Sequence, residues 1–437
     1  MVSIAGRIRA IRNSGMFIDV HDHTGKIQIF NYLKNLEPGQ RTFLSNLDVG
    51  DFVHVRGVIR RTRAGELSIN ASEVTLLTKS LHPLPDKHAG LTDTETRLRE
   101  RYLDVLTNPV AAEVIRARTH LYAALRGVLN ANDFLEVETP ILHPIPSGAR
   151  AQPFVTQHNA LGESRYLRIA PELYLKRLLV AQISNRLFEI SRNFRNEGLS
   201  FKHNPEFTML EAYMAFADYQ EIMDLTEEML KESAKVVTGG LTFQFGDNEI
   251  DFSGNWPRKT MLELIAENTG VDFSGLNDEE AKRAIVDLEI ENTDALKTWG
   301  ECVQAVFESK IEKGLIGPIH VIDYPIEISP LAKTHRRDPR LVERFETYIG
   351  GLEVCDGFTE LNDPRDQMER FREQMRKHAL GDEEALVLDQ DFIKALEIGM
   401  PPAGGVGIGI DRLLMILKNQ PNIREVLAFP DLRRKEI

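Results

Sequence analysis

The sequence predicts an α+β protein of two or three domains, and three observations lead to that expectation. The chain has 437 residues, more than one ordinary hydrophobic core can organise. Its first 80 residues are dominated by short segments of alternating polarity, which are typical of strands. Beyond residue 98, segments with helical spacing accompany strands joined by hairpin-length loops, which favours an antiparallel sheet flanked by helices.

Five β-segments are expected within residues 1–78. They read VSIAGRIRAI, MFIDVHD, KIQIFNYL, DFVHVRGVIRR and ELSINASEVTLLT, and the turn signals NSG, HTG, LEPGQ, DVGD and TRAGE separate them. Five strands in so short a stretch predict a small barrel of the OB type over residues 1–80. A fragment of a β-sandwich is the alternative, although five strands are few for a sandwich.

A polar, proline-containing segment over 81–97 is interpreted as a linker to a larger domain over 98–437. Helices are expected at 98–108, at about 110–130 with Pro109 at its favoured first position, and at 218–238, where the pattern is amphipathic. FLEVETPIL, which follows the second helix, is expected to form a strand.

Bulk composition points to a soluble protein of a reducing compartment, most simply the cytoplasm. No apolar run approaches the roughly 18 residues of a membrane helix, and the N-terminus lacks the apolar core of a signal peptide. The two cysteines, Cys302 and Cys355, form neither a CxxC pair nor a disulfide framework. Because the sequence starts at the first predicted barrel strand, no helical extension is expected before it.

The charge is distributed unevenly along the chain. The net charge is −13, yet residues 1–80 carry 11 Lys and Arg against 7 Asp and Glu. An acidic protein with a basic N-terminal module can still meet a polyanion through that module. An ordinary solvated surface is the alternative explanation of so small an excess.

NFRNEGLSFKHNPEF (193–207) places a charged loop between two predicted antiparallel strands. Arg195 and Glu197 have the same parity and are expected on one side of the first strand. The cations of Arg195 and His203 suit phosphates, whereas Glu197 and the ring of Phe207 suit a purine. A salt-bridged hairpin with a solvated tip is the alternative.

GGVGIGIDRLLMIL (404–417) lacks the features of a P-loop or of a dinucleotide-binding turn. Its glycines alternate at 405, 407 and 409, which indicates a strand with one face open to a bulky group close to the backbone. Arg412 follows that strand, where a helix is expected to begin.

These segments resemble a known family. FLEVETPIL with Pro140, FRNEG and GIGIDR resemble motifs one, two and three of class II aminoacyl-tRNA synthetases. The similarity is greatest to the lysyl-tRNA synthetases and covers essentially the whole chain. It is carried by the segments 67–105, 165–179, 192–215, 357–363 and 405–412.

The resemblance implies a class II catalytic domain that forms lysyl-adenylate from ATP and then charges tRNA. It implies an ATP site in which Arg195 and Arg412 are catalytic and contact the α- and γ-phosphates. The other implied ATP-binding residues are Glu197, His203, Asn204 and Phe207. Because the chemistry is phosphoryl displacement, positioning and charge neutralisation suffice without a nucleophilic side chain.

The resemblance also implies magnesium, held by Glu346 and Glu353. These residues are an odd number of positions apart, so an ideal strand would send them to opposite faces. A bulge at Gly350 and Gly351 is expected to bring them to one side.

For lysine, the resemblance implies Glu211, Tyr213 and Glu360 at the ε-amino group, and Glu172 with the Gly148 backbone at the α-amino group. Asp356 and Phe358 are expected in the same pocket. Ion pairs from the carboxylates to arginines within the protein are the alternative. In the barrel, the resemblance implies that Phe17, Gln28 and Glu66 read the anticodon of tRNA. It further implies a homodimer that meets through the second helix and FLEVETPIL, with Pro140 touching the partner.

Some positions depart from the family pattern: Ser147, Gln152, Leu352, Cys355 and Asp356, of which Asp356 replaces an asparagine that contacts the substrate α-carboxylate. Two charges ~4 Å apart repel by about 4 kcal/mol at an effective dielectric of ~20. A compensating neighbour, a protonated Asp356 or a different substrate would each resolve the conflict. Two alternatives therefore stand beside a lysine enzyme. One is a paralogue that activates another diamino acid or aminoacylates a protein lysine, and the other is a non-catalytic tRNA-binding homologue.

Overall fold

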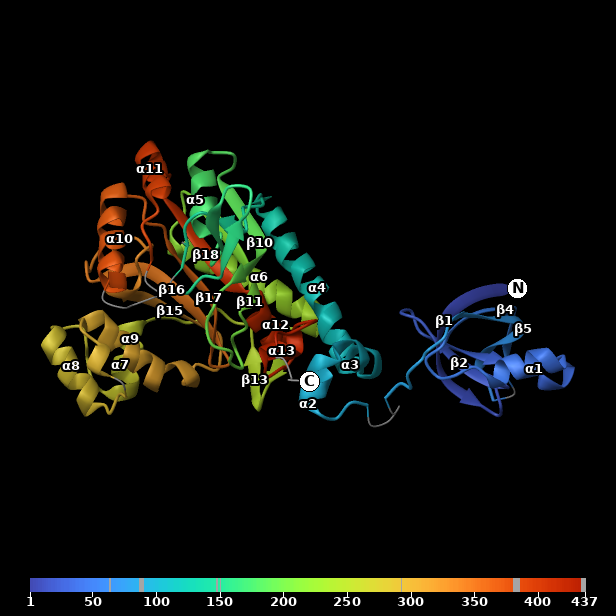
Figure 1. Ribbon diagram of the computed structural model, residues 1–437. Helices are drawn as coiled ribbons and strands as arrows, with labels where there is room; N and C mark the ends of the chain where they lie inside the picture. Colours follow the sequence, from blue (N-terminus) through green and yellow to red (C-terminus); the bar gives the residue numbers. More distant parts are fainter. Residues whose placement is uncertain are drawn as a thin grey trace. The chain divides into compact units, whose positions relative to one another are not determined.

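The computed structural model describes residues 1–62, 64–85, 90–146, 148–149, 151–291, 293–379 and 386–433. The chain forms two compact units, Met1–Asn108 and Pro109–Ile437 (Figure 1). Residues 86–89 of the predicted linker lie outside the described ranges.

The first unit contains a closed five-stranded barrel. Its strands are β1 (Val2–Arg12), β2 (Phe17–His21), β3 (Lys26–Phe30), β4 (Phe52–Arg61) and β5 (Leu67–Thr78), in the order β1-β2-β3-β5-β4. Alternate residues such as Ile8, Ile29 and Ile69 are buried inside, as the period of two predicts. The predicted barrel is confirmed, and the sandwich alternative is wrong.

Helices in this unit differ from the prediction at two places. LEPGQ, interpreted as a turn, begins the helix α1 (Pro38–Ser45), because Glu37 and Gln40 form a capping box and Pro38 occupies the first turn. The predicted helix at 98–108 is two shorter helices, α2 (Thr94–Arg99) and α3 (Arg101–Thr107). They are separated at Glu100, whose ψ of 48° is not helical.

The second unit is built on an eight-stranded sheet. The strand order is β14 (Arg258–Thr260), β15 (Ile319–Pro325), β16 (Leu341–Ile349), β17 (Leu352–Thr359), β18 (Ala403–Gly409), β11 (Glu206–Ala215), β10 (Arg186–Phe194) and β6 (Leu135–Glu136). The six central strands pair antiparallel, as predicted, but both edge strands pair in parallel with their neighbours. The sheet is therefore mixed rather than purely antiparallel.

FLEVETPIL does not form one strand. It contributes only β6 and β7 (Leu142–His143), on either side of Pro140, because proline cannot donate a ladder hydrogen bond. β7 joins a small sheet with β8 (Val155–His158) and β9 (Glu163–Leu167), and β12 (Thr242–Phe245) with β13 (Asn248–Asp251) forms a separate hairpin.

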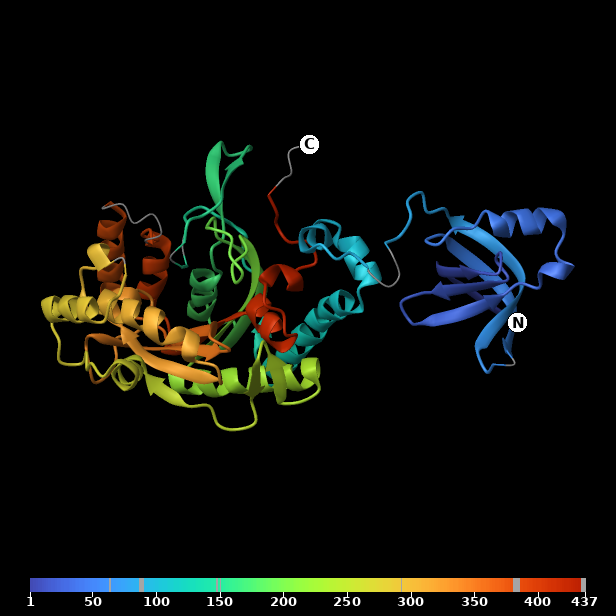
Figure 2. The ribbon, with the colours of Figure 1, turned by 90° about the horizontal axis from the view of Figure 1, so that it is seen from below.

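Helices cover one face of the sheet. α4 (Pro109–Ala131), α6 (Tyr219–Thr238) and α12 (Ile410–Leu417) share a hydrophobic core with it, and Figure 2 shows α6 running along that face. α4 and α6 confirm the two predicted helices. No helix within the described ranges combines the length and the apolar composition that a membrane crossing requires.

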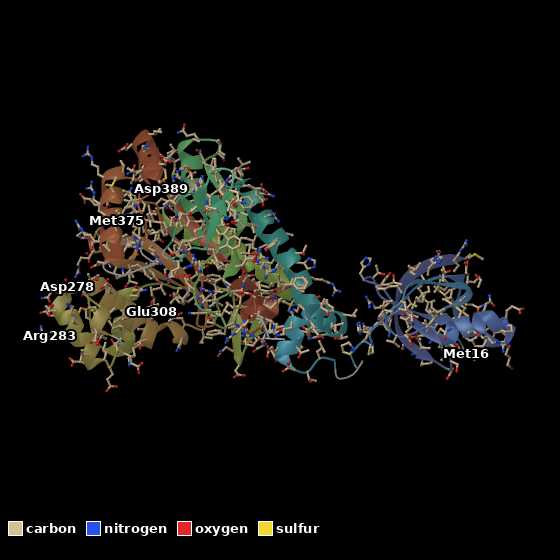
Figure 3. The ribbon with its side chains drawn as sticks, in the orientation of Figure 1. Met16, Asp278, Arg283, Glu308, Met375 and Asp389 are labelled. Carbon is tan, nitrogen blue, oxygen red and sulfur yellow. The ribbon has the colours of Figure 1, made fainter. Side chains whose placement is uncertain are left out.

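Two further helical groups complete the unit. α7 (Met261–Thr269) and α9 (Trp299–Lys310) pack against β15, and α8 (Asp278–Asp287) packs against α9. α5 (Glu172–Val180) packs against α11 (Gln390–Gly399), which contacts α10 (Pro364–Ala379), and a short helix, α13 (Ile423–Val426), follows α12. Asp389, labelled in Figure 3, caps α11 and accepts a hydrogen bond from Arg177 of α5 at 2.6 Å.

Candidate active site

A cleft opens on the face of the sheet opposite to α6 and α12. Residues of β11, β16, β17 and β18 alternate between this cleft and the core, because successive side chains of a strand point to opposite faces. One chamber of the cleft has a volume of about 290 Å³ and the adjoining one about 190 Å³. Both are lined by Arg195, Met209, Glu353, Asp356 and Gly407, so the two chambers form one continuous site.

The smaller chamber contains the predicted ATP-binding residues: Arg195, Glu197, His203, Asn204, Phe207 and Arg412. β10 and β11 pair antiparallel and present the charged loop between them, as predicted. β10 ends at Phe194, however, so Arg195 and Glu197 belong to the loop, and the strand-parity argument for them is wrong.

Arg195 is positioned to meet an anion. Its backbone N–H donates to the Pro205 carbonyl at 2.9 Å, and its guanidinium lies 5.1 Å from the centre of the Phe207 ring. Its buried Nε finds no hydrogen-bond partner among the described residues, and burial lowers the pKa of the guanidinium. A buried donor without a partner is costly, so an anionic ligand in this chamber would relieve it.

Arg412 lies in the first turn of α12 and is held from two sides. Its Nη1 donates to the carbonyl and to Oε2 of Glu353, at 2.9 and 3.0 Å, and its Nη2 lies 3.0 Å from Nε2 of His203. Burial and the neighbouring Arg412 lower the pKa of His203 to about 4, so the neutral imidazole accepts from Arg412. His203 therefore orients Arg412.

Two side chains shape the loop from behind. The amide of Asn204 donates to the Glu206 carbonyl at 2.6 Å, so this residue supports the loop. Asp411, which the sequence analysis did not single out, accepts from the Thr208 N–H at 2.8 Å and from Arg118 of α4 at 2.5 Å. Two sequence signals mark Asp411: its place in GIGIDR, and an acidic residue in the first turn of a helix.

The alternating glycines of β18 allow neighbouring strands to approach closely. A Cβ at Gly405 would lie 2.3 Å from Oε1 of Glu360 and 2.5 Å from the Tyr213 ring, and one at Gly407 would lie 2.8 Å from Met209. The bulky groups predicted against this strand are thus side chains that line the cleft.

Glu346 and Glu353 face the same chamber, but the predicted reason is wrong. Gly350 and Gly351, with φ of 62° and 72°, are the two-residue turn that joins β16 to β17. The bulge lies next to it, where Val354 is extra in the register between Thr347↔Cys355 and Tyr348↔Glu353. This extra residue moves Glu353 to the face that carries Glu346 and Asp356.

The pKa values of the two carboxyl groups are shifted in opposite directions. Oε2 of Glu346 accepts from the hydroxyls of Tyr324 and Tyr348, and burial raises its pKa to about 8. The pKa of Glu353 is lowered, because the nearby Arg412 outweighs burial. In the part of the chain that the structure describes, no three His, Cys, Asp or Glu side chains gather into a metal-binding group.

Arg344, missed in the sequence analysis, lines the larger chamber. Its Nε and Nη2 donate to the two carboxylate oxygens of Asp356 at 2.8 and 3.1 Å, and Nη2 also donates to Glu346 at 2.6 Å. Of the three resolutions offered for Asp356, the structure thus contains the compensating neighbour. An arginine two positions before a strand glutamate was the only available signal.

The predicted amino-acid pocket holds three buried carboxyl groups and one ammonium group. The Tyr213 hydroxyl donates to Glu211 at 2.9 Å, and Nζ of Lys176 lies 2.6 Å from Glu172 and 2.5 Å from Glu360. Burial raises the pKa of both Glu211 and Glu360 to about 8. The internal partner of Glu172 and Glu360 is therefore a lysine that the sequence analysis missed, not one of the arginines considered as an alternative.

The remaining predicted pocket residues also line the larger chamber. Gly148 has a φ of 100°, and a Cβ there would lie 3.1 Å from the Ala170 carbonyl, so its backbone fits closely. The Phe358 ring lies 5.2 Å from Nζ of Lys176.

Of the other departures from the family pattern, Leu352 and Cys355 are part of the hydrophobic core beneath the sheet. Gln152 accepts a backbone hydrogen bond from Asn196 at 2.8 Å, whereas Ser147 lies outside the described residues.

On the barrel, Gln28 and Glu66 line a surface hollow of about 320 Å³ together with Arg12, Asp19 and Lys26. Phe17 lies 5.3 Å from Phe30, ring centre to ring centre. Ser68 donates to Gln28 at 3.0 Å. An aromatic platform beside mixed polar groups suits an unpaired base.

The fold and the cleft together define a class. Residues 93–433 match the family model of class II tRNA synthetases (D, K and N), and residues 2–77 match that of the OB-fold nucleic acid binding domain. The chain belongs to the class II tRNA synthetase family, and the resemblance described from the sequence is confirmed.

The chain is also similar over its whole length to individual lysine–tRNA ligases. The lysine–tRNA ligase of Sinorhizobium medicae (strain WSM419) is 50% identical over 438 residues, which cover 100% of this chain and 87% of the relative. That of Moorella thermoacetica (strain ATCC 39073 / JCM 9320) is 49% identical over 438 residues, with 100% and 89% covered.

Proposed function

We propose that this synthetase activates L-lysine with ATP and transfers the lysyl group to a lysine-accepting tRNA. The observation that carries the proposal is the charge of the larger chamber. Three buried carboxyl groups, those of Glu172, Glu211 and Glu360, line this chamber, and among the described residues the one cation at ion-pair distance from any of them is Lys176, which meets Glu172 and Glu360. When all three are ionised this group of side chains lacks two positive charges, and a diamino acid brings two ammonium groups.

The position of the two chambers supports the first step of this reaction. An amino acid in the larger chamber and ATP in the smaller one meet at Arg195, which lines both. The substrate carboxylate attacks the α-phosphorus, and the bond from that phosphorus to the oxygen bridging to the β-phosphate breaks. Pyrophosphate leaves, and the product is lysyl-adenylate. Arg195 and Arg412 neutralise the negative charge that grows on the phosphates.

Glu346 and Glu353 would fit magnesium only if phosphates supplied further ligands. Glu346 and Glu353 supply oxygen ligands from one face of the hairpin, and hard cations such as Mg²⁺ prefer oxygen. The remaining ligands would have to come from phosphate oxygens and water. When bound, the metal would neutralise phosphate charge, and Arg412 would keep Glu353 ionised for it.

The second step is supported by the N-terminal barrel, which we propose reads the anticodon through Phe17, Gln28 and Glu66. Its presence argues against an enzyme that modifies protein lysines. The pairing of Asp356 with Arg344 supports L-lysine rather than a different diamino acid, because the guanidinium offsets the charge of Asp356. The buried Nε of Arg195, which has no hydrogen-bond partner among the described residues, argues against a non-catalytic homologue. Two buried free cysteines, Cys302 and Cys355, support work in the cytoplasm.

ATP–pyrophosphate exchange with a panel of amino acids tests the proposal. L-Lysine is expected to support exchange with the highest kcat/KM, ahead of ornithine, β-lysine and hydroxylysine. Arg195→Ala and Arg412→Ala are the inactive controls, each losing about 100-fold because one charged donor to the transition state is worth roughly 3 kcal/mol. Preferred exchange with another amino acid, or none at all, would overturn the proposed substrate.

A further inference from the structure

Lys176 lies wholly inside the protein, on the side of α5 that faces the larger chamber. Its side chain has no solvent-exposed surface, and Nζ lies between Oε1 of Glu172 and Oε2 of Glu360. Glu172 is one turn earlier on α5, whereas Glu360 directly follows β17. The ammonium therefore joins a helix to the sheet at the two carboxylates that the proposed function assigns to the substrate.

A purely structural role would not require a charge here. Burying an ammonium and two carboxylates carries a large desolvation cost, and apolar residues of similar volume generally stabilise such a place as well or better. An apolar side chain would fit at this position, because the Phe358 and Phe392 rings lie 5.2 and 6.0 Å from Nζ. The cation is instead placed where two acids line a cleft.

Only one carboxylate oxygen of Glu360 takes part in this ion pair. Its Oε2 meets Lys176, while its buried Oε1 has no hydrogen-bond partner in the described ranges and lies against Gly405, which lines the cleft. An unpaired carboxylate oxygen beside a cavity is a site for a second cation. Oε1 of Glu360 and the carboxylate of Glu211 are thus open to an incoming ammonium group.

We propose that Lys176 is a positioning residue for amino-acid recognition: its ammonium bridges Glu172 and Glu360, favours their ionised forms and fixes their orientation, so that Oε1 of Glu360 faces the ε-ammonium of the substrate. The inference rests on the proposed function, because it takes the ligand to be a diamino acid. This role also sets the selectivity of the pocket. With Lys176 present, two further positive charges balance the carboxylates of Glu172, Glu211 and Glu360. An amino acid with an apolar side chain supplies only one of them.

The charged and titratable groups around Lys176 come from several elements. They are Glu172 on α5, Glu211 and Tyr213 on β11, Arg344 on β16, Asp356 and Glu360 on or next to β17, and the pair of Arg177 with Asp389 beside α11. Among the described residues, Glu172 and Glu360 meet no cation but Lys176 at ion-pair distance, and Glu211 meets none. Removal of Lys176 would raise the pKa of Glu172 and Glu360, because the nearest cation that opposes the effect of burial on them would be lost.

Lys176→Met keeps the length of the side chain and removes the charge. At pH 7 the variant is expected to raise the KM for L-lysine at least tenfold in pyrophosphate exchange, with kcat and the KM for ATP within about twofold of wild type. The rise of kcat/KM for lysine with pH is expected at higher pH than in wild type, since the carboxyl groups ionise later. The defect is therefore expected to shrink between pH 7 and 9.

Two comparisons make the test decisive. Lys394→Met removes an exposed lysine of α11 and is expected to change nothing. Lys176→Gln, which retains hydrogen bonding without charge, is expected to behave as Lys176→Met, and an unchanged KM for ATP reports that each variant is folded. Wild type is assayed first, so failure to use L-lysine overturns the proposed function separately, and the variants are then assayed with the amino acid that is used.

Three results would overturn the role of Lys176. One is a pH profile parallel to wild type in both variants. Another is a parallel loss in kcat and in both KM values, which would indicate a structural role alone. The third is a lower KM for lysine at pH 7, which would mean that Lys176 competes with the substrate.

Discussion

Asp356 and Arg344 form a pair that sets the charge where the substrate carboxylate is expected. Burial raises the pKa of Asp356, while the bidentate contact with Arg344 acts in the opposite direction. Arg344 also serves Glu346, so one guanidinium is shared between two carboxylates. An approaching carboxylate therefore meets a screened Asp356, not a bare negative charge.

Asp356→Asn tests how complete this screening is. The substitution leaves Arg344 with one carboxylate instead of two, so the KM for L-lysine is expected to fall, by up to about fivefold or on the order of 1 kcal/mol. The KM for ATP is expected to change less. Exchange kinetics with L-lysine and β-lysine measure both effects. A higher KM for L-lysine would show that Asp356 assists binding, and no change with either would remove Asp356 from substrate contact.

Lysine binding is expected to release protons at pH 7. The free pocket holds Glu211 and Glu360 with pKa values raised from 4.5 to about 8, so both are largely protonated at that pH. The ammonium groups of lysine favour the ionised carboxylates, whose protons must leave. Calorimetric titration in two buffers of different ionisation enthalpy measures the release. Norleucine, which lacks the ε-ammonium, is the matched control, and equal release by both ligands would contradict the assignment of these acids.

The same raised pKa values have a stability consequence with a definite sign. The folded apoprotein holds protons that the unfolded chain loses at about pH 4.5. Their contribution is therefore full below that pH and is lost as pH rises through about 8. Saturating lysine is expected to reduce this loss.

At the level of elements, the β16–β17 hairpin aligns the predicted metal ligands. Its two-glycine turn and the bulge at Val354 together place Glu346, Glu353 and Asp356 on one face. A one-residue change of register would send Glu353 into the core. The geometry of the turn is thus coupled to the chemistry of the cleft.

Gly350→Ala is expected to destabilise the hairpin by about 2–3 kcal/mol, because φ is 62° and the new Cβ would lie 2.5 Å from the Phe245 ring. Gly246→Ala is the matched control, since its φ is 59° but a Cβ there meets nothing within 4 Å. Thermal unfolding of the two variants isolates the clash from the backbone strain. Equal losses of stability would contradict the close packing against Phe245.

The elements also show what sequence patterns can and cannot predict. Alternation of polarity correctly predicted the barrel, and helical spacing predicted α4 and α6. Pattern alone missed α1, whose signal is the local capping of Glu37 by Gln40, and it joined β6 to β7 across Pro140. The residues of the cleft followed from the family resemblance, whereas Lys176 and Arg344 emerged only when three elements met in space.

For the whole molecule, the exposed apolar residues around Pro140 favour a homodimer. Leu135, Ile141 and Leu142 are each more than 40% exposed, and β6 is an edge strand of the sheet. Light scattering at micromolar concentration is expected to give twice the 49.5 kDa mass of one chain. Leu142→Asp is expected to shift the mass toward that of one chain, with exposed Val236→Asp as control. An active species of monomer mass would contradict the dimer.

Substitutions in the barrel are expected to weaken tRNA binding without affecting amino-acid activation by the catalytic unit. Residues 1–80 carry an excess of four positive charges, so tRNA affinity is expected to fall as salt rises, through loss of counterion release.

Phe17→Ala removes one face of the Phe17–Phe30 pair, and loss of a stacked base costs about 1–3 kcal/mol. The KM for tRNA in lysylation is therefore expected to rise about tenfold, while pyrophosphate exchange in the absence of tRNA stays at the wild-type rate. Leu77→Ala, an exposed apolar change near the end of β5, is the control and is expected to alter neither measurement. An unchanged KM for tRNA in Phe17→Ala would exclude stacking by this residue, and a simultaneous loss of exchange would show that the barrel supports activation as well as tRNA binding.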